Sequence, residues 1–297
     1  MNAEILKSSL TLLLLTALTM LAFAANSVLN RMALAGHLIG PSEFALIRLC
    51  AGAGILALLV RATSPRFFDF SEVSVTSVGA LAVYMLGFSF AYIWLDVGTG
   101  ALILFGGVQV TMFAGALVLG ERPPLRRWAG AGLALAGLVW LVWPGAGASA
   151  PLWAAAAMAA AALGWGIYSL IGRGSADPLG DTGAAFVWAT VLGFVAVLVQ
   201  TGGSMVNDAT WAGMALAVIS GAVTSGLGYA LWYRVLPRIG ASVAGLMQLS
   251  VPVIASLGGA LLLAEAPTQA MIWAGAVVLG GIGWGLWPQR TKGSSGS

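Results

Sequence analysis

The sequence predicts an all-α membrane protein with ten transmembrane helices, arranged as two inverted five-helix repeats with both termini in the cytoplasm. Three features predict this fold. They are the apolar composition, the distribution of basic residues along the chain, and a motif that occurs twice, once around Glu121 and once around Glu265.

The composition places the chain in a lipid bilayer. Of its 297 residues, 60% are hydrophobic and 8% are charged, whereas soluble domains are about 25% charged. So apolar a chain has too little polar surface to face water. The net charge of +3 lies almost entirely in the connections, and we expect no nucleic-acid partner. With one cysteine and one histidine, no disulfide, metal site or cofactor is expected.

The two ends of the chain differ in character. The first apolar run reads LTLLLLTALTMLAFAANSVL, and it contains a possible cleavage motif at Ala22-Phe23-Ala24. Because no polar mature chain follows, we expect this run to be retained as the first span. The last residues read GSSGS and resemble an added linker, so residues 291–297 are excluded from the predicted fold.

Ten segments are long enough to span a membrane, since a helix needs about 20 apolar residues to cross the hydrocarbon core. They lie at roughly 10–33, 42–60, 74–95, 98–119, 127–144, 152–172, 183–201, 210–233, 240–263 and 268–287. We expect residues 1–144 to form the first five-helix repeat and residues 145–290 to form the second, inverted one.

Basic residues set the predicted orientation. With the N-terminus in the cytoplasm, almost all of the 13 Lys and Arg residues fall on inside segments. The inside residues are Lys7, Arg61, Arg66, Arg122, Arg126, Arg127, Arg173, Arg234, Arg238, Arg290 and Lys292. Short cytoplasmic loops are rich in Lys and Arg. The pattern therefore favours ten spans with both termini inside, and only Arg31 and Arg48 fall elsewhere.

The repeated motif reads ALVLGERPPLRRWAGAGLALAGLVWLVWP from Ala116 and ALLLAEAPTQAMIWAGAVVLGGIGWGLWP from Ala260. One offset aligns a glutamate, two tryptophans and two prolines, which indicates an internal repeat. Because each half has five spans, an odd number, the second half is predicted to be inverted. The inversion accounts for Arg122, Arg126 and Arg127 in the first copy, where the second has Ala266, Ala270 and Met271. Inverted repeats are typical of alternating-access transporters, with the substrate site near the midplane.

The chain resembles the ten-span branch of the drug/metabolite transporter superfamily, the EamA family. The resemblance rests on LSVPVIASLGGALLLAEAPTQAMIWAGAVVLGGIGW from Leu249, on its counterpart from Phe105, and on EFALIRLCAGAGILALL, which contains Arg48. Within the superfamily, the chain is most similar to the bacterial aromatic amino acid exporters (YddG-like). The resemblance implies export of neutral amino acids across the bacterial inner membrane. One departure is that Pro252 aligns with Val108, so a bend in the first half would depend on glycine.

Acidic residues are confined to span ends and connections, at Glu4, Glu43, Asp69, Glu72, Asp96, Glu121, Asp177, Asp181, Asp208 and Glu265. With no carboxylate in the middle of a span to bind a cation, we expect a net neutral substrate. Arg48 lies about 9 Å into the second span. It is either a structural, snorkelling arginine or an anchor for a substrate carboxylate, and the sequence leaves both open.

Uncharged polar and aromatic residues within the spans form the candidate substrate site. Amides can bind ammonium and carboxylate groups without adding charge, and aromatic rings stack on aromatic ligands. Each residue taken alone is equally compatible with helix packing. The candidate substrate-binding residues are Asn26, Asn30, Tyr84, Phe88, Gln109, Trp165, Tyr168, Tyr229 and Gln248. The candidate hinge residues are Gly106, Gly107, Gly164, Gly226 and Pro252.

Together these features predict a secondary transporter that exports neutral, aromatic and other apolar amino acids through a central cavity. Efflux of a drug or another small metabolite is the alternative. An enzyme is disfavoured because the sequence has no metal-ligand spacing or nucleophile–base pair. A channel is disfavoured because no charged ring or filter loop is present. The oligomeric state is left open, with a monomer as the default expectation.

Overall fold

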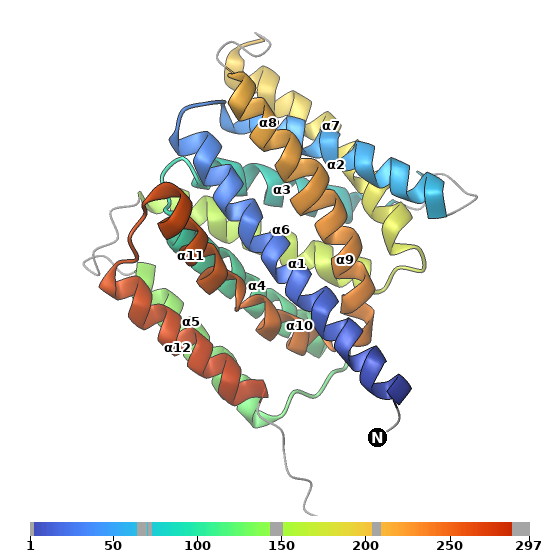
Figure 1. The fold of residues 1–297 in the computed structure, drawn as a ribbon, viewed down its shortest axis with the longest axis vertical. Coiled ribbons are helices and arrows are strands. Elements are labelled where there is room, and N and C mark those ends of the chain that lie inside the picture. Colours follow the sequence, from blue (N-terminus) through green and yellow to red (C-terminus); the bar gives the residue numbers. More distant parts are fainter. Residues whose placement is uncertain (1–2, 64–69, 71–72, 143–150, 204–208, 287–297) are drawn as a thin grey trace, which may run out of the picture.

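The computed structural model describes residues 3–63, 70, 73–142, 151–203 and 209–286, and all of their regular structure is helical (Figure 1). The helices are α1 Ala3–Ala35, α2 Pro41–Thr63, α3 Val75–Ala91, α4 Val97–Val118, α5 Leu125–Val142, α6 Leu152–Arg173, α7 Pro178–Thr201, α8 Trp211–Ile219, the π-helix η1 Ser220–Leu227, α9 Gly228–Val235, the 3₁₀ helix η2 Leu236–Arg238, α10 Ala241–Gln248, α11 Val251–Leu263 and α12 Gln269–Leu286.

Seven helical segments in the described part of the chain are long and apolar enough to cross a membrane, so the chain is a multi-pass membrane protein. The segments are 10–35, 41–63, 97–118, 152–173, 178–201, 211–238 and 241–263. The predicted spans 74–95, 127–144 and 268–287 correspond to the shorter helices α3, α5 and α12. Ten spans, their inversion and the cytoplasmic termini therefore stay predictions.

Local sequence explains where several helices begin and end. Pro178 occupies the first turn of α7, where its missing N–H costs nothing, and the Asp177 side chain accepts a hydrogen bond from the Gly180 amide. Thr210 caps α8 in the same way, accepting from the Gly213 amide at 3.0 Å. α7 ends at Thr201 and is followed by Gly202, whose φ of +63° is left-handed and suits glycine.

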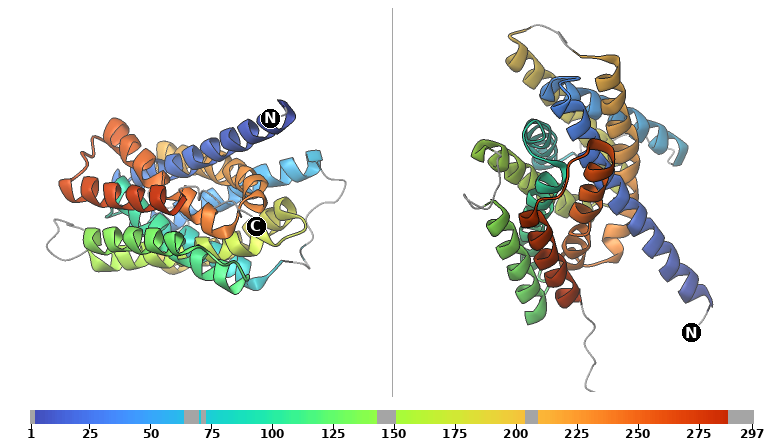
Figure 2. Two further views of the ribbon diagram at one scale, coloured as in Figure 1. Left: turned by 90° about the horizontal axis from the view of Figure 1, so that it is seen from below. Right: turned by 60° about the vertical axis from the view of Figure 1, so that its left-hand side comes forward.

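The helices pack as an elongated bundle (Figures 1 and 2). α5 and α12 lie side by side at one edge. α4 packs against α10 and α11, and α2 packs against α7 and α8 toward the other edge. α1 runs across the bundle and contacts α9, η1 and α11. Segments from the two predicted halves are therefore interleaved throughout the bundle.

Small residues allow the closest helix contacts, as is common in membrane bundles. In the α5–α12 pair, a Cβ on Gly130 would lie 2.4 Å from the Gly281 carbonyl oxygen, and a Cβ on Gly281 would lie 2.6 Å from the Gly130 carbonyl oxygen. Between α2 and η1, a Cβ on Gly221 would lie 2.2 Å from the Arg48 carbonyl oxygen. Neither contact has room for a larger side chain.

Two of the predicted spans are not uniform α-helices. The segment predicted at 210–233 as one helix changes to π-helix over Ser220–Leu227, a change that the sequence pattern does not predict. The segment predicted at 240–263 is split at Leu249 and Ser250, so that α11 begins with Pro252 in its first turn. Proline disfavours helical geometry in the residue before it and cannot continue the hydrogen-bond ladder. By contrast, α4 is continuous through Gly106 and Gly107.

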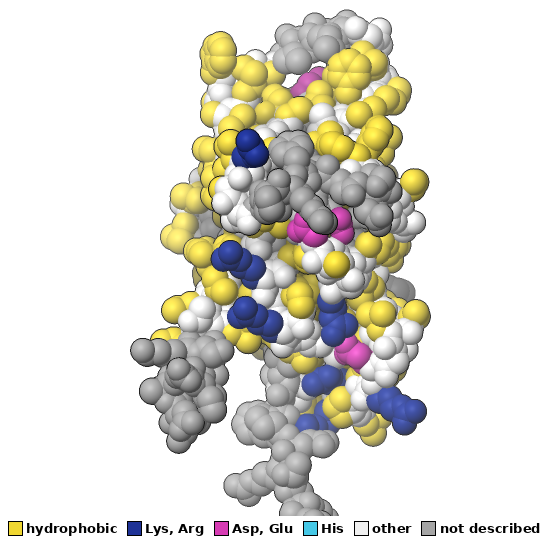
Figure 3. Space-filling view, turned by 90° about the vertical axis from the view of Figure 1, so that its right-hand side faces the viewer, with side chains coloured by type: hydrophobic (Ala, Val, Ile, Leu, Met, Phe, Trp, Pro, Cys, Tyr) yellow, Lys and Arg dark blue, Asp and Glu magenta, His cyan; other side chains and the backbone are white. Residues whose placement is uncertain are grey.

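The outer surface is suited to lipid. Leu58, Val118 and Leu261 are 67%, 88% and 83% exposed, and extensive exposure of large apolar side chains suits a surface that faces lipid. Hydrophobic side chains cover much of the face in Figure 3, and the Lys and Arg side chains visible there lie mostly in its lower half.

We expect Gly221→Ala to destabilise the protein by about 1–3 kcal/mol, because the new methyl group must displace the α2 backbone. The measurement is the thermal unfolding of purified protein in detergent. Gly54→Ala on α2 is the control, because a Cβ there meets nothing within 4 Å. Equal stability of the two variants would contradict the close α2–η1 contact.

Candidate functional site

Arg48 of α2 lies at the centre of a buried polar cluster, with 0% exposure. Its Nη2 donates to the hydroxyl of Tyr84 at 2.9 Å and to that of Tyr229 at 3.1 Å. Its Nε donates to Ser225 Oγ at 2.9 Å. The guanidinium carbon also lies 5.3 Å and 5.1 Å from the ring centroids of Tyr84 and Phe88, within cation–π range. Residues of α2, α3, η1 and α9 thus converge on one cation.

An amide–hydroxyl cluster adjoins Arg48 through α1. Asn26 Oδ1 accepts hydrogen bonds from Thr224 Oγ1, at 3.0 Å, and from Ser220 Oγ. Asn30 Nδ2 donates to the Asn26 carbonyl at 2.9 Å, and Asn30 Oδ1 accepts from Ser89. Asn26 Nδ2 lies 3.5 Å from the Tyr84 hydroxyl, which links this cluster to the arginine.

Aromatic rings form the other side of the site. The Trp165 ring lies 4.6 Å, 5.1 Å and 5.3 Å, centroid to centroid, from the rings of Tyr229, Tyr84 and Phe23. Its indole Nε1 donates to Gln248 Oε1 at 2.8 Å, which connects α6 to α10. Aromatic pairs at these separations are favourable beyond their buried area. The site therefore joins an apolar, aromatic half to a hydrogen-bonding half.

The structure brings most of the predicted substrate-binding residues into one connected region. Asn26, Asn30, Tyr84, Phe88, Trp165, Tyr229 and Gln248 are linked by the contacts above. Tyr168 lies at the edge, 5.9 Å from the Trp165 ring, and its carbonyl accepts from Tyr233. Gln109 is buried against Gly245 of α10, and its amide has no hydrogen-bond partner among the described residues. A role for any of the predicted residues in substrate binding stays a prediction.

Several residues of the site were not predicted from sequence. They are Phe23, Ser89, Ser220, Thr224 and Ser225. The spacing of Ser220, Thr224 and Ser225 within one apolar span was an available signal. The π-helix determines which neighbours these three side chains reach, and no pattern in the sequence predicts it.

The predicted hinge glycines occupy tight packing positions. A Cβ on Gly107 would lie 2.7 Å from Ala162, and one on Gly164 would lie 2.5 Å from the Ala80 carbonyl oxygen. Gly226 lies against Ile55. Gly106 is buried within the unbroken α4, and only Pro252 adjoins an interrupted helix. A hinge role for these residues stays a prediction.

Glu121, just after α4, caps the start of α10. Its Oε1 accepts from the Ala241 amide at 2.9 Å and pairs with Arg173, at the end of α6, at 3.1 Å. Ser242 Oγ donates to Oε2 at 3.2 Å. A carboxylate at a helix N-terminus satisfies a free amide and lies at the positive end of the helix dipole.

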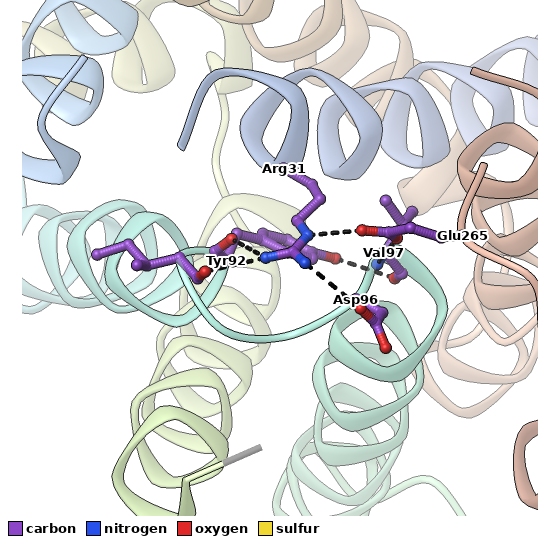
Figure 4. Close-up of polar contacts among 6 residues, drawn as sticks. Arg31, Tyr92, Asp96, Val97 and Glu265 are labelled. Atoms are coloured by element: carbon purple, nitrogen blue, oxygen red, sulfur yellow. Dashed lines mark hydrogen bonds and ion pairs between the residues drawn. The ribbon is translucent and has the colours of Figure 1, made fainter. Parts of the chain in front are cut away.

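Glu265, just after α11, makes the corresponding contacts at the start of α4 (Figure 4). Its Oε2 accepts from the Val97 amide at 2.8 Å, and its Oε1 pairs with Arg31, near the end of α1, at 2.6 Å. Arg31 also donates to the carbonyl of Ile93 at 2.9 Å and to Asp96 at 3.4 Å. Each carboxylate thus follows one helix and caps the other, which fixes α4 antiparallel to the α10–α11 segment.

The pKa of Glu121 lies below its ordinary value. Burial alone would raise it, but the amides of Ala241 and Ser242 and the charge of Arg173 stabilise the carboxylate and outweigh burial. Because the pKa is lower in the folded than in the unfolded state, the ionised group stabilises the fold above the unfolded pKa. That stabilisation is lost as the pH falls through the folded pKa.

We therefore expect wild-type protein to be more stable than Glu121→Gln near pH 6, with a difference that shrinks once the pH falls below about 4.3, the ordinary pKa of Glu. The measurement is the unfolding temperature of both proteins in detergent from pH 6 to pH 3. A difference that is the same at every pH would show that the carboxylate charge makes no contribution.

Comparisons with known proteins agree with this architecture. The sequence model of the EamA-like transporter family matches residues 152–285. Uncharacterized protein PA1977 of Pseudomonas aeruginosa is 45% identical over 281 residues, which cover 93% of this chain and 95% of that protein. One crystal structure matches with a TM-score of 0.67 at 20% identity, covering 91% of this chain and 96% of that chain. At that identity, the structural likeness concerns the fold alone.

Proposed function

The chain belongs to the EamA-like transporter family, and from this premise we propose that it exports neutral amino acids, aromatic and other apolar ones, by alternating access through a central cavity. Membership of this family indicates a membrane transporter of small metabolites. The amino acid substrate, the direction of transport and a location in a bacterial inner membrane are our proposals.

The substrate proposal rests on one observation: an aromatic surface and a hydrogen-bonding surface lie next to each other between the helices. Trp165, Phe23 and Tyr229 supply aromatic surface that suits an apolar side chain. Asn26 and its hydroxyl partners supply uncharged hydrogen-bonding groups. Among the described residues, no ion pair brings a carboxylate into this region. A substrate with a net positive charge would have no counter-ion there, which favours a neutral one.

We also propose that residues 1–144 and 145–290 are inverted repeats, with Glu121 facing the cytoplasm and Glu265 facing outside. The offset that aligns these two glutamates also aligns Val97 with Ala241, the residues whose amides they cap. Each glutamate also pairs with an arginine near the end of another helix. In the α5–α12 pair, the Gly130–Gly281 contact has its counterpart in the contact of Ala274 with Gly137. This correspondence supports a two-fold relation between the halves.

Purified protein reconstituted in liposomes should move labelled phenylalanine along its gradient, and unlabelled aromatic and other apolar amino acids should compete. Folded protein that moves no neutral amino acid would contradict the substrate proposal. If it moved amphipathic drugs or another metabolite in the same assay, the alternative substrate class would be correct.

The substitution Trp165→Leu tests whether this transport activity depends on the site. Loss of ring stacking should lower the apparent affinity for phenylalanine about three- to tenfold, with a smaller effect on leucine. Trp188→Leu is the matched control, because Trp188 is 46% exposed and lies outside the aromatic cluster. Equal effects of the two substitutions on phenylalanine would argue against the site.

A further inference from the structure

We propose, on the basis of the proposed function, that Arg48 binds the carboxylate of the substrate through its Nη1 group. The transported molecule is then a carboxylate-bearing compound, such as a zwitterionic amino acid, rather than an amine or an uncharged drug. The proposal rests on the charge balance of the site, on the hydrogen bonds of the guanidinium, and on the position of the aromatic cluster.

The charge of Arg48 is not balanced by the protein around it. The side chain is 0% exposed, and no Asp or Glu of the described residues lies within 4.0 Å of it. Its polar partners are two phenolic hydroxyls and one serine, all uncharged. A buried cation without an anion is costly in a membrane, and a substrate carboxylate supplies the missing charge.

The hydrogen bonds of the guanidinium leave one edge free. An arginine has five N–H donors, one on Nε and two on each terminal nitrogen. Nε binds Ser225, and Nη2 binds both Tyr84 and Tyr229. Nη1 is buried and has no partner among the described residues. Because buried donors are nearly always paired, two donors on a fixed cation indicate a position for an anionic acceptor.

The surrounding helices hold this guanidinium in a defined orientation. The rings of Tyr84 and Phe88 lie within cation–π distance of its carbon. The close contact of Gly221 with the Arg48 carbonyl brings η1 against α2 and places Ser225 beside Nε. π-Helical segments often occur at functional sites. The arginine is therefore preorganised before an anion arrives, which lowers the entropic cost of binding.

The same tyrosines place the arginine next to the aromatic cluster. The hydroxyls of Tyr84 and Tyr229 accept hydrogen bonds from Arg48 Nη2, and the rings of both tyrosines contact the Trp165 ring. Tyr84 and Tyr229 therefore belong both to the arginine site and to the aromatic cluster, so a ligand that binds Arg48 through its carboxylate lies beside residues of that cluster. Because Arg48 is fully enclosed here, the ligand reaches it when the helices separate on one side of the bundle.

The first test compares ligands on wild-type protein. In liposomes that transport labelled phenylalanine, the competitors are phenylalanine, 3-phenylpropionate, phenylethylamine and phenylalaninol. 3-Phenylpropionate keeps the carboxylate and lacks the amine, whereas the last two lack the carboxylate. A hydrogen bond to a charged group corresponds to about tenfold or more in affinity. We expect 3-phenylpropionate to compete at least about tenfold better than either compound without a carboxylate.

The second test assigns this preference to Arg48. Arg48→Gln should abolish the preference for the carboxylate, and Arg48→Lys should weaken it, because an ammonium lacks the planar fork of the guanidinium. Arg61→Gln, an exposed position on the same helix, is the control and should keep the wild-type ranking. If the Arg48 variants fail to fold, the wild-type ligand comparison still decides whether the site selects carboxylates.

Binding is measured separately from transport, as the rise in unfolding temperature that each compound causes in purified protein. If no neutral amino acid is transported, the proposed function fails, and 3-phenylpropionate should still stabilise the protein more than phenylethylamine. If phenylalanine is transported but phenylalaninol binds as well as 3-phenylpropionate, the Arg48 proposal fails alone. Retention of the carboxylate preference by Arg48→Gln would also overturn it.

Discussion

The structure depends on two carboxylates that each follow one helix and cap another. Glu121 binds the first amide of α10, and Glu265 binds the first amide of α4. α4 has 22 residues, so the two caps are about 33 Å apart along it. The free amides at the start of a helix need hydrogen-bond partners from outside the helix. Two long-range contacts therefore fix the direction, register and ends of the central helices.

The central site follows from this arrangement. Among the described residues, Arg48 is a fully buried cation whose hydrogen-bond partners are all uncharged. Hydroxyls from α3, η1 and α9 accept hydrogen bonds from Arg48, and Asn26 of α1 binds the neighbouring hydroxyls of Tyr84 and Thr224. The aromatic cluster around Trp165 fills the adjacent space. A neutral solute with an apolar side chain suits such a site better than a cation does.

The helical, multi-pass character of the fold was predictable, because the length of an apolar run is a local feature of the sequence. The prominence of Glu121 and Glu265 in the repeat pointed to two equivalent turns, although not to the amides they cap. Tyr84 and Phe88 were grouped correctly because residues four apart share one helix face. The break before α11 lies next to Pro252, which sequence alone marks as a helix disruptor.

The contacts of the site were harder to predict, since they depend on how distant helices meet. Arg48 binds Ser225, which is 177 residues away, and the π-helix changes the face on which Ser225 lies. Nothing in the local sequence SGAVTSGL predicts the wider helical turn of the π-helix. Gln109 and Gln248 were both predicted to bind substrate, yet Gln248 binds Trp165, whereas Gln109 packs against Gly245.

The central claim is that the two capping turns lie on opposite sides of the membrane. The most direct test places single cysteines beside them, at Arg122→Cys and Ala266→Cys, both exposed positions, in a Cys50→Ser background. A membrane-impermeant thiol reagent added to intact cells should label the cysteine at 266 and leave the one at 122 unlabelled until the membrane is opened. Labelling of both positions, or of neither, in intact cells would contradict the inverted arrangement.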